Sequence, residues 1–264
     1  MAHEAVSTAR CAWWYPLGIM DAMAKGTEPC GDETYDTPVI LVHGFGHNRS
    51  GWTVAQHHLR AAGFTSVHTM NYNPLRHDLP ELAAQLSDRV KLVRMLTGAP
   101  RVHLVGHSLG GLLIRWYVQE LDGADKVATA ITVASPHEGT WAALAGMGRT
   151  ARQLRPGASV VRRLARPVRP NDVRWIAYYS NLDLLVQPGA SAMIRHPDLR
   201  AANVLVKDLG HLSTMVSPLV TRSIVHQLEA AEAATGTADL LPLRAPEVAE
   251  SGDIEAHDIV AIAH

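Results

Sequence analysis

A serine in a short glycine-flanked segment is the first group in this chain that could do chemistry. Ser108 is the centre of Gly106-His107-Ser108-Leu109-Gly110, which has the spacing G-x-S-x-G and follows a short apolar run. A strand-to-helix turn with this spacing holds the serine in a strained backbone geometry, and its small outer residues let strand and helix approach closely. The turn also places the hydroxyl at a helix N-terminus, which favours developing negative charge. The segment therefore indicates a nucleophile.

A serine nucleophile needs a base to take its proton and a carboxylate to orient that base. His211 lies in a loop after the last strand that we predict in the catalytic domain, and Asp183 lies just past the end of the strand before it. Loops that follow parallel strands meet at one edge of the sheet. We therefore predict a triad of Ser108, Asp183 and His211. Asp208 is the rival acid, although a residue three positions from its histidine usually forms a local turn or cap.

Two backbone N–H groups are candidates for an oxyanion hole, which a tetrahedral acyl intermediate requires. The apolar run PVILVH ends in a glycine-rich turn that can present the N–H of Phe45. Leu109, the residue after the nucleophile, supplies the second donor in the usual arrangement. The alternative for the glycine-rich turn is a tight loop with no role in catalysis.

Short apolar runs alternate with helical patterns along the chain, which predicts an α/β fold: a doubly wound, mostly parallel sheet with helices on both faces. The predicted strands are Pro38–His43, Val67–Met70, Arg101–Val105, Val127–Ala134, Val173–Tyr179 and Asn203–Val206. The predicted helices are Asp78–Leu96, which opens with Asp78 and Glu81 as a cap, Leu112–Leu121 and Met215–Leu228.

The composition is that of an ordinary globular protein. The chain has 264 residues, of which 47% are hydrophobic and 19% charged, with a formal net charge of -1. These values exclude a collagen, a coiled coil and a mostly disordered chain, and the balanced charge argues against a protein built to hold nucleic acid. We expect an N-terminal arm over 1–36, a catalytic domain over 37–234 and a loosely attached tail over 235–264.

Several motifs in sequence order resemble those of a known family. The segments VILVHGFG, LVGHSLGG, VASPHEGT, YSNLDLLVQP and LGHLSTMVSP together resemble the α/β-hydrolase bacterial lipases and esterases, most closely the small triacylglycerol lipases and their actinobacterial relatives. The resemblance runs from about Pro38 to Gln227. It implies the α/β-hydrolase fold, cleavage of esters, and the same triad and oxyanion donors. It also implies that residues 134–140 line or support the site.

We expect a serine hydrolase of carboxylic esters that acylates Ser108 and is then deacylated by water. The rate should fall as acid protonates His211, because only neutral imidazole can act as the base. An acyltransferase or an amidase with the same triad is one alternative, and a non-catalytic module that binds a lipid or a partner protein is another. We assign no cofactor and no metal, because the histidine pairs at 57–58 and at 43 and 47 lack a matched carboxylate set.

The residues that surround the predicted site suggest an apolar acyl pocket for a small-molecule ester or lipid. Leu182 and Leu185 are near its expected mouth, although ordinary core packing explains each apolar residue equally well. The candidate substrate-binding residues are Trp52, His107, Trp141, Leu184 and Val186.

An arginine-rich insertion at about 140–171 is expected to cover part of the site. Between Gly139 and Asn171 the chain holds seven arginines and no acidic residue. One interpretation is a solvated cap whose guanidinium groups pair with carboxylates elsewhere. Another is a mobile cover that makes transient contact with an anionic lipid interface. Nucleic-acid binding is disfavoured, because aromatic residues are not interleaved with the arginines.

The sequence also bears on compartment. The longest run without Asp, Glu, Lys or Arg, Ala61–Leu75, is too short to cross a bilayer. The apolar run Cys11–Met20 holds a proline and two tryptophans, which makes a poor signal peptide. We therefore expect a cytoplasmic rather than a secreted protein. Cys11 and Cys30 could form a disulfide or stay as two thiols.

Overall fold

A computed structural model of the chain describes residue 4, residues 34–236 and residues 259–262. Most of the expected arm, both cysteines and most of the expected tail lie outside these described residues. No helix among the described residues has the length and apolar character needed to span a membrane.

Seven strands form one sheet in the order β2-β1-β3-β4-β5-β6-β7. The first six pair in parallel and β7 is antiparallel to β6, so the predicted doubly wound fold is confirmed. Strand β7 lies within 235–264, the range that we expected to be a loosely attached tail. The strands are β1 Val39–Val42, β2 Val67–Met70, β3 Val102–His107, β4 Val127–Val133, β5 Arg174–Ser180, β6 Ala202–Val206 and β7 Ile259–Ile262.

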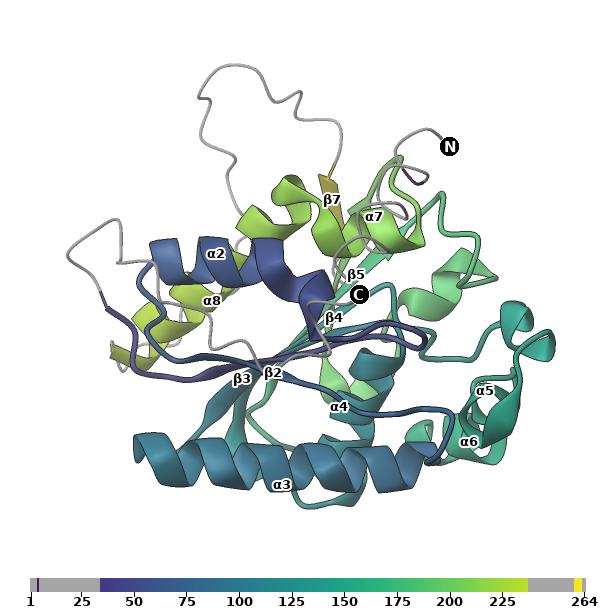
Figure 1. Cartoon of the computed structure of the whole chain (residues 1–264), viewed down its shortest axis with the longest axis horizontal. Coiled ribbons are helices and arrows are strands. Elements are labelled where there is room, and N and C mark those ends of the chain that lie inside the picture. The colour runs from purple at the N-terminus through teal and green to yellow at the C-terminus, as the bar shows by residue number, and fades with distance from the viewer. Residues whose placement is uncertain (1–3, 5–33, 237–258, 263–264) are drawn as a thin grey trace.

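Helices cover both faces of the sheet (Figure 1). On one face lie α2 (Thr53–Ala61), α7 (His211–Val216) and α8 (Pro218–Gly236). On the other face lie α3 (Leu79–Thr97) and α4 (Leu109–Glu120), with α5 (Gly148–Gln153) and α6 (Ser159–Leu164) beside them. The short 3-10 helices are η2 Arg49–Trp52, η3 Ala124–Lys126, η4 Trp141–Leu144, η5 Gly189–Ala192 and η6 Pro197–Leu199.

Two hydrophobic cores follow from the alternation of side chains along buried strands. In β1, Ile40 and Val42 belong to the core under α3 and α4, whereas Val39 and Leu41 belong to the core under α2 and α8. All four side chains are fully buried. A strand buried on both faces is therefore largely apolar along its length, which explains the continuous apolar runs in the sequence.

The predicted N-terminal cap of α3 forms as expected. The Asp78 carboxylate accepts a hydrogen bond from the Glu81 N–H at 3.0 Å, and the Glu81 carboxylate accepts one from the Asp78 N–H at 2.9 Å. The reciprocal pair satisfies two N–H groups that a helix start leaves without partners. Gly98 ends the helix with a φ of 71°, a conformation that glycine adopts without strain.

The prediction of one helix over Met215–Leu228 was wrong, because the structure divides this segment into α7 and α8. Ser217 is extended, with a φ of -67° and a ψ of 124°, and Pro218 begins the second helix. Proline disfavours helical backbone at the residue before it and suits the first position of a helix. The break lets α7 begin at His211 and turn separately from α8.

The arginine-rich insertion is tied to α4, the helix that follows Ser108. Arg115 of α4 is buried, and its guanidinium donates hydrogen bonds to the Leu164 carbonyl at 2.7 Å and to the His137 carbonyl at 3.5 Å. Its Nε–H also donates to Gln119 at 3.0 Å. Burial lowers the pKa of Arg115 to about 10, which leaves it charged at neutral pH. A buried cation thus joins α4 to the end of α6.

Candidate active site

The glycine-flanked serine lies on a strained turn between β3 and α4. Ser108 has a φ of 52° and a ψ of -118°, a region that residues with a side chain rarely occupy. A Cβ atom on Gly106 would lie 2.6 Å from the backbone of Gly110, and one on Gly110 would overlap the carbonyl of Val42. Larger residues at either position would therefore push the strand and the helix apart, as the sequence pattern indicated.

His211 and Asp183 form a buried pair. His211 Nδ1 lies 2.7 Å from Asp183 Oδ2, and Asp183 is only 1% exposed. The other carboxylate oxygen accepts hydrogen bonds from the N–H groups of Leu185 at 2.8 Å and Val186 at 2.9 Å. A carboxylate can only accept, so Nδ1 carries the hydrogen and Nε2 is left as an acceptor.

The rival acid is not placed to orient the base. Asp208 is exposed, and its side chain accepts a hydrogen bond from Asn181 at 3.5 Å rather than from His211. Its own N–H is held by the Asn181 side chain at 2.9 Å. Asp208 therefore links the loop after β6 to the loop after β5, and it neither contacts the base nor forms the local turn that we expected for it.

Ser108 and His211 line one cavity of about 300 Å³ at the carboxyl edge of the strands. Among the described residues Ser108 forms no hydrogen bond with His211, so this structure holds the acid–base pair but not the link from base to nucleophile. The other lining residues include the predicted His107 and Val186, and also His47, Pro136, Thr140, Leu154, Leu185 and Leu212.

Trp52 does not line this cavity, and in this respect the sequence prediction was wrong. Its side chain is 1% exposed and packs in the core with Ala55 and Leu59 of α2. Trp52 is the last residue of η2, and its side chain packs in the core between α2 and the sheet. The sequence alone does not show which way the Trp52 side chain points, because this depends on how the adjoining helix α2 packs on the sheet.

Trp141 and Leu184 are also absent from the cavity wall, but for the opposite reason. They are 59% and 74% exposed, respectively. Both are next in sequence to lining residues, Ala142 and Leu185. With their exposed apolar neighbours they form what we call the apolar rim: Trp141, Leu144, Met147, Leu182, Leu184 and Leu185.

The two predicted oxyanion donors belong to segments next to Ser108, since Leu109 follows it and Gly44, which precedes Phe45, packs against it. Phe45 lines the cavity from the turn after β1, and Leu109 is the first residue of α4. A helix begins with N–H groups that have no partner within the helix. Within the described part of the chain, neither the Phe45 N–H nor the Leu109 N–H donates to another group. Both are therefore available to a ligand.

Three further residues support the site. The resemblance implied this role for residues 134–140, which include Thr140, but the sequence did not assign it to the other two residues. Thr140 accepts a hydrogen bond from the Gln187 N–H at 2.9 Å and donates one to the Leu185 carbonyl at 2.7 Å, which braces the loop that holds Asp183. The HEGT segment was the available signal for Thr140.

The second supporting residue is Glu4, far away in sequence. Its carboxylate accepts hydrogen bonds from the N–H groups of Leu212 at 2.8 Å and Ser213 at 3.1 Å, and from the Ser213 hydroxyl at 2.6 Å. It therefore holds the first turn of α7, the helix that begins at His211. No local pattern marks a contact across this separation.

His107, the third, joins the elbow to the base. Its Nε2–H donates to the His211 carbonyl at 3.0 Å. Burial lowers the pKa of His107 well below its usual range, and the neighbouring His211 lowers it further. His107 is therefore neutral at physiological pH and acts as a fixed donor.

Among the described residues no group of three or more His, Cys, Asp or Glu side chains could hold a metal ion.

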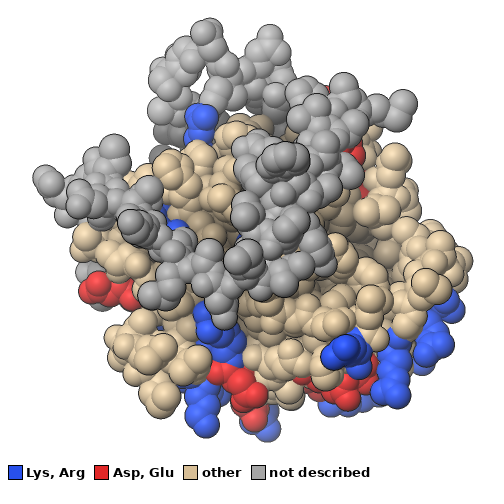
Figure 2. Space-filling view, viewed as in Figure 1, with Lys and Arg blue, Asp and Glu red and all other residues tan. Residues whose placement is uncertain are grey.

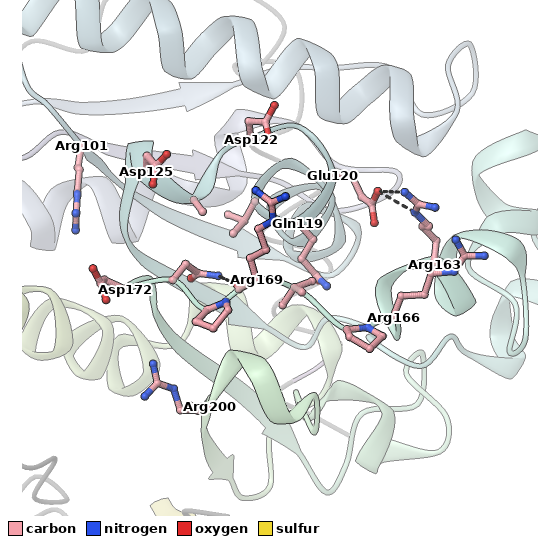
Figure 3. Close-up of a pocket in the computed structure, with 16 residues that line it drawn as sticks. Arg101, Gln119, Glu120, Asp122, Asp125, Arg163, Arg166, Arg169, Asp172 and Arg200 are labelled. Carbon is pink, nitrogen blue, oxygen red and sulfur yellow. Dashed lines mark hydrogen bonds and ion pairs between the residues drawn. The ribbon is translucent and has the colours of Figure 1, made fainter.

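A second and larger cavity, about 720 Å³, lies at the opposite edge of the sheet, where β3, β5 and β6 begin. Exposed charged side chains surround it, and Figure 3 shows Arg169 among them. Only Arg163 forms an ion pair there, with Glu120 at 2.8 Å. The charged lining residues are Arg101, Arg163, Arg166, Arg169, Arg200, Glu120, Asp122, Asp125 and Asp172.

The sheet order, the strained serine turn and the paired histidine and aspartate define an α/β-hydrolase. Residues 38–182 match the profile of the palmitoyl protein thioesterase family, which is more than half of the chain. The chain belongs to this family. The match ends one residue before Asp183.

Curated relatives match part of the chain. A triacylglycerol lipase of Burkholderia plantarii is 36% identical over 129 residues, which are 45% of this chain and 35% of that protein. A triacylglycerol lipase of Pseudarthrobacter phenanthrenivorans is 36% identical over 111 residues, 39% of this chain and 34% of that protein. The chain thus spans about a third of the length of these relatives.

Solved structures show the same fold at low identity. A Bacillus licheniformis lipase in mature form has a TM-score of 0.63 at 16% identity, over 77% of this chain and 96% of that one. Aspergillus fumigatus lipase B has a TM-score of 0.62 at 18% identity, over 75% of this chain and 55% of that one. A Paleococcus ferrophilus monoacylglycerol lipase has a TM-score of 0.56 at 18% identity, over 74% of this chain and 96% of that one. These structures support the fold.

Proposed function

We propose that this protein is a serine hydrolase that cleaves carboxylic esters of lipids through an acyl-enzyme on Ser108. The observation that carries this proposal is the buried pair of His211 and Asp183, which opens on the same cavity as the strained serine. The relatives named as lipases support ester cleavage in particular.

Each residue has one task in the proposed reaction. His211 Nε2 takes the proton of the Ser108 hydroxyl as the oxygen attacks the ester carbonyl, and the resulting imidazolium is stabilised by Asp183. The N–H groups of Phe45 and Leu109 bind the developing oxyanion. His211 then gives the proton to the leaving alcohol. In the second half of the reaction, His211 takes a proton from a water molecule as the water oxygen attacks the acyl carbonyl, and it returns this proton to Ser108 as the carboxylic acid leaves.

The apolar rim points to a long acyl chain presented at a lipid surface. Its six large apolar side chains are exposed around a cavity whose inner wall is also apolar, at Leu154 and Val186. Contiguous exposed apolar residues at a cavity mouth are typical of lipid or protein contact. We propose that the rim lies against the lipid while one acyl chain enters the cavity.

The insertion over 140–171 would then be a partly anchored cover within a catalytic domain that spans 37–234. Of its seven arginines, only Arg163 forms an ion pair with a described carboxylate. Figure 2 shows Lys and Arg side chains along the lower edge of the face in view, with Asp and Glu side chains among them. Unpaired guanidinium groups would favour anionic over neutral lipid.

A thioester is the second candidate substrate, favoured by the family match. The acyl-enzyme would be the same, and only the leaving atom would change from oxygen to sulfur. Hydrolysis rates on matched O-acyl and S-acyl substrates with one chain length separate the two. Added alcohols or amines, followed by product analysis, would reveal an acyltransferase or an amidase.

Labelling with a fluorophosphonate tests the proposal. We expect the wild type and Ser66→Ala, a serine change at the opposite edge of the sheet, to be labelled and to hydrolyse short soluble esters. Ser108→Ala should fold normally by circular dichroism and lose both labelling and turnover. Absence of label on the folded wild type would favour a non-catalytic module, and turnover by Ser108→Ala would place the nucleophile elsewhere.

The rim is tested with the double variant Met147→Ser/Leu184→Ser. We expect it to keep the wild-type rate on a short soluble ester and to lose activity on an emulsified long-chain ester. Equal rates on the emulsion would contradict a role for the rim. Vesicles of anionic and neutral lipid then separate the arginines of the cover from the rim itself.

A further inference from the structure

The carbonyl oxygen of Gly44 receives two hydrogen bonds in the turn after β1. His43 Nδ1 lies 2.8 Å from it, and the N–H of His47 donates to it at 3.3 Å. The second bond closes a four-residue turn in which Gly46 has a φ of 71°. A positive φ at the third residue alone defines a type II turn, which requires glycine there.

The hydrogen bonds of His43 fix its tautomer. The Gly44 oxygen can only accept, so Nδ1 must carry the hydrogen. The other nitrogen, Nε2, accepts a hydrogen bond from the Tyr72 N–H at 3.4 Å, so it must be bare. Burial lowers the pKa of His43 to about 4, in agreement with a neutral ring at physiological pH.

Packing holds the ring in this orientation. The His43 ring is stacked on Tyr72, with centroids 4.1 Å apart and planes 5° from parallel. The Tyr72 hydroxyl in turn donates to the His43 carbonyl. His43 is fully buried and therefore has no water to replace the Tyr72 or Gly44 contacts. The ring is thus a rigid donor aimed at one carbonyl.

That carbonyl belongs to the peptide unit whose N–H is the Phe45 donor. In a planar trans peptide the C=O and the N–H point in opposite directions. A group that pulls the Gly44 oxygen toward His43 therefore turns the Phe45 N–H to the other side. Gly44 packs directly on the nucleophile elbow, because a Cβ there would lie 2.9 Å from His107 Nδ1 and 3.0 Å from Ser108 Cβ.

We propose that His43 is a positioning residue that holds the Gly44–Phe45 peptide so that the Phe45 N–H faces the oxyanion formed above Ser108. This inference rests on the proposed function, because an oxyanion forms only if Ser108 attacks a carbonyl. His43 does not touch the substrate. Its effect is on the transition state, where charge develops on the oxygen, and not on ground-state binding.

An isosteric pair of variants isolates the hydrogen bond. His43→Asn and His43→Leu both remove the ring and its stacking on Tyr72, but the Asn amide can still donate to the Gly44 carbonyl from nearly the position of Nδ1. We expect His43→Leu to lower kcat about 10- to 100-fold relative to His43→Asn, with KM nearly unchanged. Removal of a whole oxyanion donor costs about 10²- to 10³-fold, and a misdirected donor should cost less.

A trifluoromethyl ketone that forms a tetrahedral adduct on Ser108 gives a readout that general destabilisation would not move. Its affinity should fall in parallel with kcat in His43→Leu and recover in His43→Asn. His58→Leu is the matched control, because the His58 ring makes the same kind of single bond, to the Val54 carbonyl at 2.9 Å, in a helix away from the cavity. It should match the wild type.

Equal kcat and equal inhibitor affinity in the two His43 variants would overturn the inference while leaving Ser108 as the nucleophile. Turnover by Ser108→Ala would instead overturn the proposed function. If neither His43 variant folds, the ¹⁵N spectrum of the wild-type ring decides. A hydrogen on Nδ1 supports the inference, and a hydrogen on Nε2 overturns it.

Discussion

The two cavities at opposite edges of the sheet differ in the way their polar groups are held. At the carboxyl edge, the smaller cavity has an apolar wall, and its polar groups are buried and fixed by hydrogen bonds, as in the pair of His211 and Asp183. At the amino edge, the cavity is more than twice as large, but most of its arginines and carboxylates are exposed, and the two kinds are nearly balanced in number. Cavity volume and charge alone would favour the amino edge, where the described lining residues include no buried pair of acid and base. Preorganised polar groups distinguish a site that can do chemistry.

The largest expected difference between the two edges comes from Asp183→Asn. The Asn amide would present a donor to His211 or turn the ring, so the base would hold the wrong tautomer. We expect kcat to fall about 10⁴-fold with the fold intact. The matched change at the other edge, Asp172→Asn, should leave kcat within about twofold of the wild type in the same ester assay. Comparable losses in both variants would contradict the comparison.

The two edges should also differ in their response to acid. His43 and His107, at the carboxyl edge, and His137 beside it are buried, and burial lowers the pKa of each: to about 4 for His43, and well below 6.5 for the others. The unfolded chain binds these protons below pH 6.5 and the folded chain does not. The free energy of unfolding should therefore fall as pH drops from about 6.5 toward 4, by up to about 1.4 kcal/mol per pH unit for each histidine.

Urea unfolding at pH 7 and at pH 5.5 measures this slope. His137→Gln should make it shallower, because the glutamine does not titrate. Arg200→Gln, in the larger cavity at the amino edge of the sheet, should leave this slope unchanged. A free energy of unfolding that is constant between pH 7 and pH 5 would show that these histidines are not held neutral by the fold.

A smaller effect is expected from Glu4→Ala, which removes the acceptor for the first N–H groups of α7. Loss of a comparable helix cap costs about 1 kcal/mol. Because α7 begins at His211, we expect part of this cost to appear as a roughly three- to tenfold lower kcat. Glu4→Gln keeps a side-chain carbonyl that can accept and should retain most of the activity. Identical kcat values for Glu4→Ala and the wild type would limit Glu4 to a role in stability.

The smallest expected effect is that of Arg163→Gln, which breaks the ion pair with Glu120 in the larger cavity at the amino edge of the sheet. Arg163 is exposed, and exposed ion pairs contribute little to stability. The ester hydrolysis rate and the midpoint of thermal unfolding should both match the wild type. A clear loss of hydrolysis would mean that a change at the amino edge of the sheet affects the site at the carboxyl edge.

Local patterns in the sequence predicted most of the scaffold. Strand β2 has the predicted bounds, and α3 begins at the predicted cap of Asp78 and Glu81, because both depend on residues near one another in the chain. The strained serine turn was predictable for the same reason. The division of α7 from α8 could have been read from Pro218, which we included in one continuous helix.

Contacts between distant segments were less predictable. The chain order of Ser108, Asp183 and His211 suggested their common edge, but only coordinates show Asp183 at 2.7 Å from His211. The inward direction of Trp52 depends on where α2 packs, and the contact of Glu4 with α7 depends on a closure over some 200 residues. Neither leaves a periodic or spacing signal.

The buried Arg115 restricts how a substrate could reach Ser108. Because its guanidinium holds the end of α6 to α4, the helix that follows Ser108, lifting α6 away would leave a cation without partners in an apolar interior, which is costly. The far end of the cover, from Trp141 to Met147, has no such anchor to α4 among the described hydrogen bonds. Entry of an acyl chain should thus depend on displacement of this shorter stretch, with α6 acting as a fixed wall.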